Sequence, residues 1–363
     1  MKHATPRTLT ISRDLKISRQ FLDLRISFGK EISARLDTSD QKVIYYFERA
    51  FTRWMFNVAK AGINPFVERV TIADFVSKAD LEYFKSRYPA YRTFDNFDWS
   101  WLETTLAKIY ETDAIPLGVM STVAKDNDVI LSYIWPDGEN VTYTMPIKTY
   151  EHAKELYVGP RGKHHEYILL VISRYDACGT TKNHCAVPKE VISFVGATTE
   201  LFGSPINTCT KQYCSPFPDI EAYFGSLGSF FSPTFRLSTG IYMCNPPYDE
   251  NIITDMTHRL LDGLRSGQEI TIILVLPVWD LAGQKKIKPG YEGVKEFEAL
   301  KLLTESGFVR SQMMLNFNDY QFYDYYLDKF TKVTDTHLMV LSNTNCGLQA
   351  VDIAQHWAQI VHN

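Results

Sequence analysis

Apolar residues recur at helical spacing in the first third of the chain. Residues 40–61 form the strongest such segment, and Gly62 follows it where a helix usually ends. Segments 71–89 and 98–113 show the same kind of pattern. The apolar positions of the strongest segment are Val43, Ile44, Phe47, Phe51, Trp54, Met55 and Val58. The first third of the chain is therefore predicted to be mainly helical.

The pattern changes after this helical part. Residues 128–147 alternate around Asp137-Gly138, which is typical of a β-hairpin. Later runs are short and apolar throughout, and helical segments separate several of them. Such runs indicate strands of a buried, largely parallel sheet that helices cover on both faces. The predicted strand runs lie within residues 166–177, 198–204, 240–248, 269–279 and 336–343.

These patterns predict an α/β fold with two domains. Residues 1–165 are expected to form a mainly helical N-terminal domain with a β-hairpin near its end. Residues 166–363 are expected to form the domain that contains the sheet. A chain of 363 residues, of which 45% are hydrophobic and 22% charged, is long enough for both cores.

Charge and cysteine content narrow the class of protein. A net charge of −4 argues against a protein that grips long nucleic acid through an overall positive field, although a local basic patch is compatible with it. The N-terminus lacks the apolar core of a signal peptide, and no run is long enough to span a membrane. Six cysteines without CxxC spacing favour reduced thiols and no metal site. We expect an intracellular protein without membrane contact, in the nucleus or the cytoplasm.

The tetrapeptide Asn245-Pro246-Pro247-Tyr248 directly follows an apolar strand run. Two successive prolines forbid a regular strand or helix, so the chain leaves the strand in a fixed, extended form. In parallel sheets, ligands gather beyond the carboxyl ends of the strands. One reading is a turn that merely closes a strand, and the other is a loop that binds a ligand.

Methyl transfer to a planar amine explains all four residues. The nitrogen lone pair is delocalised, so two acceptors that grip the amine hydrogens favour a more nucleophilic, tetrahedral nitrogen. The Asn245 side chain and the Pro246 carbonyl can supply the acceptors, and Tyr248 can stack on the base. The tetrapeptide followed by an amphipathic helix therefore favours an amine methyltransferase. Similar loops serve adenine, cytosine and the amide of glutamine, so the substrate stays open here.

The expected methyl donor is S-adenosylmethionine. Its binding loop is predicted after the run that ends at Glu200, because glycine and small polar residues let backbone approach a ligand. Asp219 is a candidate acceptor for a ribose hydroxyl, and Arg174 and Asp176 are further candidates after an earlier run. The predicted loop contributes Gly203, Ser204, Pro205 and Asn207.

A longer set of motifs narrows the substrate. The segment FGSPINTCTKQYCSPFPDIEAYFGSLGSFF, followed by NPPYDE and VLPVWD, resembles the phosphorylated-CTD-interacting-factor family. These cap-specific methyltransferases act on N6 of the first transcribed adenosine of capped mRNA. The family's SPLN, RQYCSAFPD, YFGS, NPPF and PEWRE elements occur here in the same order, and weak similarity extends from Tyr167 to Asn343. The resemblance implies a Rossmann-like methyltransferase sheet in the second domain.

The resemblance also implies roles for individual residues. Asn245 to Tyr248 would form the catalytic loop and border the methyl donor. Glu250, Trp279 and Asp280 would bind substrate, because a methylated guanine cap is a planar cation that an aromatic face and a carboxylate attract. The basic loop 283–293 is the expected contact to the cap triphosphate. An alternative for Trp279 is that it packs a strand end.

Three departures from the family's pattern affect these expectations. Tyr248 replaces a phenylalanine, which keeps the stacking face, and PVWDLAG replaces PEWRE, so that only the tryptophan carries over. No WW module is visible, so no WW-type contact to the polymerase tail is expected. The sequence thus predicts an mRNA (2'-O-methyladenosine-N6-)-methyltransferase whose partner is capped RNA with a 5' adenosine. The alternatives are a methyltransferase for internal adenine or protein glutamine, and a catalytically silent cap-binding subunit.

Overall fold

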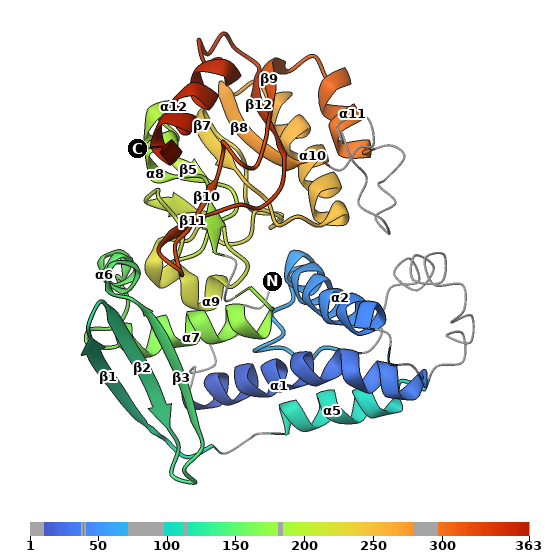
Figure 1. Ribbon diagram of the computed structural model, residues 1–363, viewed down its shortest axis with the longest axis vertical. Helices are drawn as coiled ribbons and strands as arrows, with labels where there is room; N and C mark the ends of the chain where they lie inside the picture. The colour runs from blue at the N-terminus through green and yellow to red at the C-terminus, as the bar shows by residue number, and fades with distance from the viewer. Residues whose placement is uncertain are drawn as a thin grey trace. The chain divides into compact units, whose positions relative to one another are not determined.

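The computed structural model describes residues 11–37, 39, 41–71, 98–111, 115–180, 184–278 and 297–362. The chain divides into two compact units, as Figure 1 shows with the elements labelled. The first unit comprises Met1–Lys154 and Gly159–Lys182, and the second comprises Glu155–Val158 and Asn183–Asn363. Residues 166–182, which the sequence assigned to the second domain, lie in the first unit.

Helices dominate the first unit. They are α1 (Ile11–Arg35), α2 (Gln41–Lys60), α5 (Ser100–Tyr110), α7 (His164–Ala177) and α6 (Ile147–Leu156), whose last two residues belong to the second unit. Phe28 of α1 is fully buried and contacts the rings of Phe51 and Trp101, so α1, α2 and α5 share one aromatic core. The helices predicted within 40–61 and 98–113 are thereby confirmed, whereas the helix predicted at 71–89 lies outside the described residues.

The first unit also contains a three-stranded antiparallel sheet in the order β1-β2-β3. Its strands are β1 (Val119–Lys125), β2 (Asp128–Ile134) and β3 (Asn140–Pro146). The predicted hairpin around Asp137-Gly138 is confirmed as the β2–β3 pair, and Gly138 adopts the positive φ of 86° that its turn requires. The strand β1 adds a third member that the alternation did not predict.

The strand predicted at 166–177 is wrong, because these residues form helix α7. Nearly every residue of α7 is buried, including Ile168, Leu169 and Ile172. A helix that is surrounded by protein has no polar face, so its apolar run cannot be distinguished from a buried strand by periodicity. Arg174, predicted as a possible donor contact, is fully buried in α7 and forms an ion pair with Asp14 of α1 at 3.3 Å.

A six-stranded sheet organises the second unit in the order β6-β5-β7-β8-β12-β9. The first four strands are parallel, whereas β12 is antiparallel to both β8 and β9. The sheet is therefore mixed and not wholly parallel. Its strands are β5 (Thr199–Glu200), β6 (Gln212–Tyr213), β7 (Gly240–Cys244), β8 (Ile270–Pro277), β9 (Val309–Leu315) and β12 (Thr336–Ser342).

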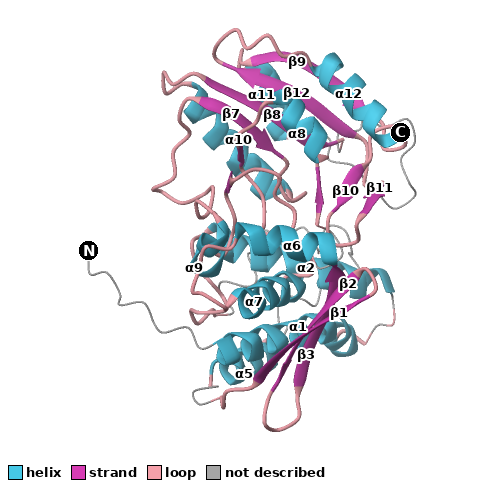
Figure 2. Ribbon diagram, turned by 90° about the vertical axis from the view of Figure 1, so that its left-hand side faces the viewer, coloured by secondary structure: helices cyan, strands magenta, loops and turns pink. Residues whose placement is uncertain are grey.

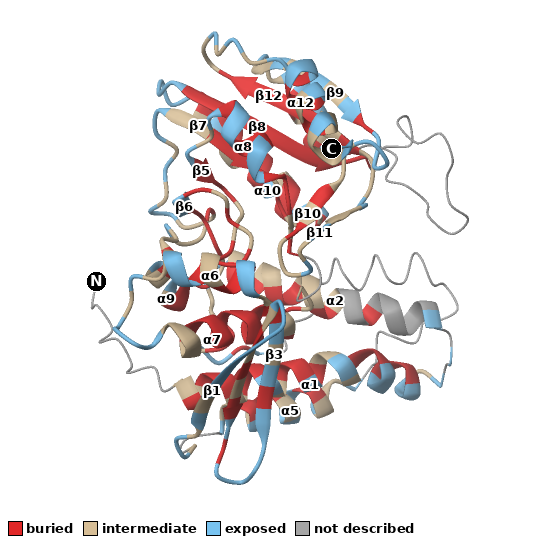
Figure 3. Ribbon diagram, turned by 60° about the vertical axis from the view of Figure 1, so that its left-hand side comes forward, coloured by how far each residue is buried: buried red, intermediate tan, exposed pale blue. Residues whose placement is uncertain are grey.

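Helices cover both faces of this sheet, which confirms a mixed α/β architecture (Figure 1). Helices α10 (Glu250–Leu264) and α11 (Glu298–Glu305) pack on one face, and α8 (Lys189–Val195) and α12 (Ala350–His362) pack on the other. Every residue of β8 is buried, as the red strands of Figure 3 illustrate.

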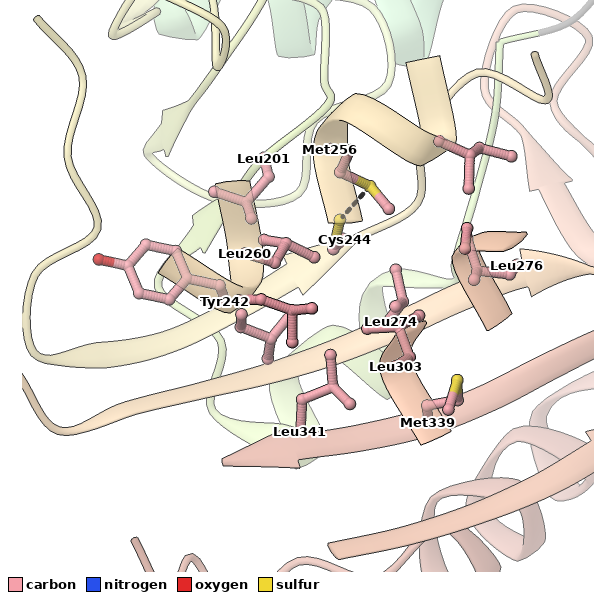
Figure 4. Packing of buried hydrophobic residues seen from close by; sticks show 14 of the residues in the cluster. Leu201, Tyr242, Cys244, Met256, Leu260, Leu274, Leu276, Leu303, Met339 and Leu341 are labelled. Carbon is pink, nitrogen blue, oxygen red and sulfur yellow. Dashed lines mark hydrogen bonds between the residues drawn. The ribbon is translucent and has the colours of Figure 1, made fainter. Parts of the chain in front are cut away.

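Successive residues of β7 alternate between the two cores. Cys244 belongs to the core under α10, together with Leu260 and Leu274, and Figure 4 shows this packing. Its neighbour Met243 belongs to the opposite core with Trp357 of α12. This alternation explains why the strand runs are apolar throughout, since both faces of each strand are buried.

The second unit contains two further groups of short elements. One comprises helix α9 (Pro218–Glu221) and a single 3₁₀ turn (Ala222–Phe224). The other is a small antiparallel sheet in the order β11-β10-β4, formed by β4 (Cys185–Ala186), β10 (Phe322–Asp324) and β11 (Lys329–Thr331). No described helix is long and apolar enough to cross a membrane.

Candidate active site

The predicted catalytic loop connects the carboxyl end of β7 to helix α10. The Asp249 N–H donates to the Pro247 carbonyl at 2.8 Å. The buried Asp249 carboxylate caps α10 by accepting from the Ile252 N–H at 3.1 Å. The proline pair and the helix cap together fix the path of the loop on both sides of Tyr248.

Two acceptors of this loop form no hydrogen bond with the residues that the structure describes. Asn245 is half-buried and Pro246 is buried. Within the described part of the chain, neither the Asn245 side chain nor the Pro246 carbonyl takes part in a hydrogen bond. Most buried carbonyl groups are paired, so an unpaired one beside a free amide oxygen is suited to an external donor. The loop thus carries two hydrogen-bond acceptors, on successive residues, that no described residue occupies.

Tyr248 presents an uncharged ring beside these acceptors. Its side chain is half-buried and its hydroxyl oxygen is buried. Burial raises the pKa of Tyr248, and the nearby Cys185 thiol raises it further, so the hydroxyl stays protonated at physiological pH. A neutral ring is compatible with stacking on a planar base.

The loop after β5 begins beside the loop after β7. The Leu201 N–H donates to the Met243 carbonyl at 2.9 Å, which continues the pairing of the two strands by one residue. The Gly203 N–H donates to the Cys214 carbonyl at 2.9 Å. A Cβ atom at Gly203 would lie 3.2 Å from the Cβ of Tyr213, so glycine lets that tyrosine pack against the loop.

The predicted donor-binding residues of this loop partly bind one another. Both the N–H and the hydroxyl of Ser204 donate to Asn207 Oδ1, at 2.9 and 2.8 Å. Ser204 and Pro205 are buried, so they shape the loop from inside. Asn207 is half-buried, and its Nδ2 donates no hydrogen bond within the described residues. Asn207 therefore retains a donor that a ligand can use.

Sequence reasoning missed Glu200, the last residue of β5. Only 4% of the residue is exposed. Its Oε1 atom accepts from the Cys209 N–H at 2.5 Å, from the Thr210 N–H at 3.1 Å, and from the Thr208 and Thr210 hydroxyls at 2.8 and 3.2 Å. Burial raises the pKa of Glu200, and these bonds to the carboxylate oppose that rise.

The other oxygen of Glu200 remains available. Its Oε2 atom accepts no hydrogen bond from the described residues. Glu200 thus places an open acceptor at the carboxyl end of β5, next in the sheet to β7. In the sequence, the only sign of this site is a glutamate at the end of an apolar run. A charged residue at such a position is usually explained as a solvated strand end.

Asp219 lies half-buried in the first turn of α9. Other residues of the FPDIEAYFGS segment around it stabilise the local backbone. The buried Glu221 carboxylate accepts from the Phe217 N–H at 2.9 Å. Gly225 of the YFGS element has a φ of 92°, and a Cβ atom there would lie 2.8 Å from the Lys211 carbonyl oxygen. The glycine of this motif is therefore required by the backbone itself.

The predicted substrate-binding residues are only partly described. Glu250 is exposed at the first position of α10, and its pKa is raised by partial burial and by the carboxylates of Asp249 and Glu298. Trp279, Asp280 and the basic loop 283–293 lie outside the described residues. Their proposed contacts to the cap and its phosphates stay predictions.

Comparison with known proteins confirms the resemblance that the motifs indicated. The family model described as "Phosphorylated CTD interacting factor 1 WW domain" matches residues 149–325, which include the loops after β5 and β7. A human protein named mRNA (2'-O-methyladenosine-N(6)-)-methyltransferase is 37% identical over 87 residues, which cover 23% of this chain and 12% of that protein. The mouse protein of the same name is 36% identical over 85 residues, with the same coverage. The matched segment thus spans about one eighth of the length of these relatives.

Proposed function

From this resemblance we propose that the chain is an S-adenosylmethionine-dependent methyltransferase that acts on N6 of the cap-adjacent adenosine of capped mRNA. The pair of unused acceptors, Asn245 Oδ1 and the Pro246 carbonyl, carries this proposal. They lie at the carboxyl end of β7, beside an aromatic ring, where an exocyclic amine can donate both hydrogens.

The sheet order supports a Rossmann-like methyltransferase domain. After β5 the chain adds β6 on one side, and later it adds β7 on the other side. The order of strands therefore reverses between β5 and β7, and in open α/β sheets ligands bind beyond the carboxyl ends at such a switch point. The loops that begin at Leu201 and Asn245 both start there.

The residues present fit the proposed donor. Its amino-acid tail and ribose offer hydrogen-bond donors and acceptors, and the loop after β5 offers one of each. Glu200 Oε2 is an unused acceptor, and Asn207 Nδ2 is an unused donor. Several internal hydrogen bonds hold the loop that carries both groups, so little rearrangement is needed for binding.

The mechanism follows from what the catalytic loop can do. When bound, S-adenosylmethionine supplies an electrophilic methyl group on a positively charged sulfur. Asn245 Oδ1 and the Pro246 carbonyl accept the two amine hydrogens and favour a tetrahedral nitrogen with a developed lone pair. Tyr248 orients the adenine by stacking, and the excess proton leaves to water after transfer. No residue with a shifted pKa has to act as a base.

Contact with the cap is proposed for Glu250, Trp279 and Asp280. Glu250 is the first residue of α10 and closely follows Tyr248, so its carboxylate can reach a group attached to the target nucleotide. The positive charge of a methylated guanine favours a carboxylate and an aromatic face.

A test of the donor site is the substitution Glu200→Gln. Glutamine keeps a carbonyl oxygen for the four bonds that hold residues 208–210, but it replaces the open acceptor by an NH₂ group. We expect the dissociation constant for S-adenosylmethionine, measured by calorimetry, to rise about 10- to 100-fold, because a charge-assisted hydrogen bond is lost. Glu190→Gln removes the same charge from an exposed position of α8 and serves as the control. Unchanged donor affinity in Glu200→Gln contradicts the assignment.

The substrate is tested with matched RNAs that begin with adenosine and differ only in the cap. We expect nucleoside mass spectrometry to find N6-methyladenosine at the first position of capped RNA and little in uncapped RNA. Equal methylation of internal adenosine in uncapped RNA would overturn the cap assignment. Methylation of glutamine, or donor binding without any product, would favour the alternative functions.

A further inference from the structure

The hairpin formed by β10 and β11 has an internally braced turn. Asp324 is fully buried, and its Oδ1 atom accepts from the Tyr326 N–H at 3.0 Å and from the Leu327 N–H at 3.1 Å. Tyr323, on the same hairpin, donates its hydroxyl to Asp328 at the other end of the turn. The hairpin is drawn beside the larger sheet in Figure 2. Its turn therefore presents Tyr325 in a fixed position.

Tyr325 connects this turn to the loop after β5. Its hydroxyl lies 2.8 Å from the Cys209 sulfur, and its N–H donates to the His184 carbonyl at 3.3 Å. Cys209 in turn donates its N–H to Glu200 Oε1 at 2.5 Å. Burial, with a smaller effect of the Glu200 charge, raises the pKa of the Cys209 thiol to about 12. The thiol is therefore protonated at neutral pH, and the contact is constant across that range.

A second bond holds the hairpin to strand β4. Strand β4 pairs with β10 so that Cys185 lies opposite Asp324, and the Cys185 thiol donates to Asp324 Oδ2 at 3.8 Å. The hairpin is thus bonded both to β4 and, through Tyr325, to the loop after β5.

We infer that the β10–β11 hairpin is a positioning element for the loop after β5, which is the proposed donor loop, with Tyr325 and Asp324 as the positioning residues. Tyr325 acts on the donor loop through Cys209, and Asp324 holds the turn that presents Tyr325. The role of this loop in donor binding rests on the proposed function, whereas the mechanical connection does not. Neither positioning residue needs to touch donor or RNA.

The connection to the donor loop is tested with Tyr325→Phe, which removes only the hydroxyl. We expect amide hydrogen exchange of residues 208–210 to accelerate about five-fold, since one hydrogen bond that braces them is lost. The dissociation constant for S-adenosylmethionine should rise by a similar factor. Tyr320→Phe is the control, because it removes the same atom from a half-buried tyrosine outside the hairpin whose hydroxyl makes no hydrogen bond with the described residues. Neither quantity should change in it.

A double substitution separates a specific contact from a general loss of packing. Cys209→Ala should reproduce the effect of Tyr325→Phe, and the combined variant should exchange no faster than either single variant. Additive effects, equal effects of Tyr325→Phe and Tyr320→Phe, or unchanged exchange in Tyr325→Phe would each overturn the inference. If the unsubstituted chain binds no S-adenosylmethionine, the proposed function fails, while the exchange measurement still tests the hairpin.

Discussion

Asn245→Ala is expected to lower methyl transfer about 100- to 1000-fold, with the loss mainly in kcat. The amide oxygen of Asn245 is one of two acceptors at the carboxyl end of β7 that bond to none of the described residues. Its bond to the amine strengthens as the nitrogen becomes tetrahedral, so its removal affects the transition state more than the ground state. Single-turnover kinetics with saturating donor and capped RNA measure this effect.

Asn245→Asp provides the matched comparison. Aspartate has almost the same shape and keeps an acceptor at the same atom, so it should retain more activity than alanine. The melting temperatures of both variants should stay close to that of the unsubstituted chain, because Asn245 makes no hydrogen bond with described residues. A full-rate alanine variant, or equally inactive alanine and aspartate variants, would contradict the proposed role of the acceptor.

Arg174→Leu is expected to destabilise the first unit by about 3–5 kcal/mol. Arg174 is fully buried in α7, and its guanidinium pairs with Asp14 of α1 at 3.3 Å and lies over the ring of Phe66. Leucine removes the cation and leaves the Asp14 carboxylate in the interior without it. Chemical denaturation monitored by tryptophan fluorescence and by hydrogen exchange in α1 measures the loss.

The double variant Asp14→Leu with Arg174→Met distinguishes a buried charge from a general packing defect. Replacement of both partners by apolar residues of similar size is often neutral, because it removes the desolvation cost of both charges. We expect this variant to regain most of the stability that Arg174→Leu loses. If the double variant is less stable than Arg174→Leu, the loss of the ion pair at the Asp14 carboxylate is not what destabilises Arg174→Leu.

Segment 166–177 shows why a local pattern was insufficient for part of the fold. Its apolar residues are equally compatible with a buried strand and with a buried helix. The segment forms helix α7, which packs against α1 inside the first unit. The hairpin around Asp137-Gly138 was predictable because one face of β2 is buried and the other is not, and the turn requires glycine. A local pattern distinguishes a helix from a strand most clearly where solvent contacts only one of two faces.

Ser204 and Glu200 show the same limit within the candidate site. Ser204 was predicted to approach the donor, but its N–H and hydroxyl both bind Asn207. Glu200 was not considered, although it collects four hydrogen bonds on one oxygen and leaves the other open. A polar group is paired or unpaired according to the residues that the fold brings next to it. The residue's own motif does not show these partners.

The sequence by itself determined the family resemblance and predicted amine methyl transfer, because Asn245 to Tyr248 carry acceptors and a ring within one stiff tetrapeptide. It also predicted β5, β7, β8 and β12, since short apolar runs indicate strands that are covered on both faces. Only the tertiary structure decided which acceptors bond to no described residue, that Glu200 lies at the same edge of the sheet as Asn245, and that the β10–β11 hairpin contacts the loop after β5. The physical reason is that stiffness and hydrophobicity are local properties, whereas hydrogen-bond pairing depends on contacts between distant residues.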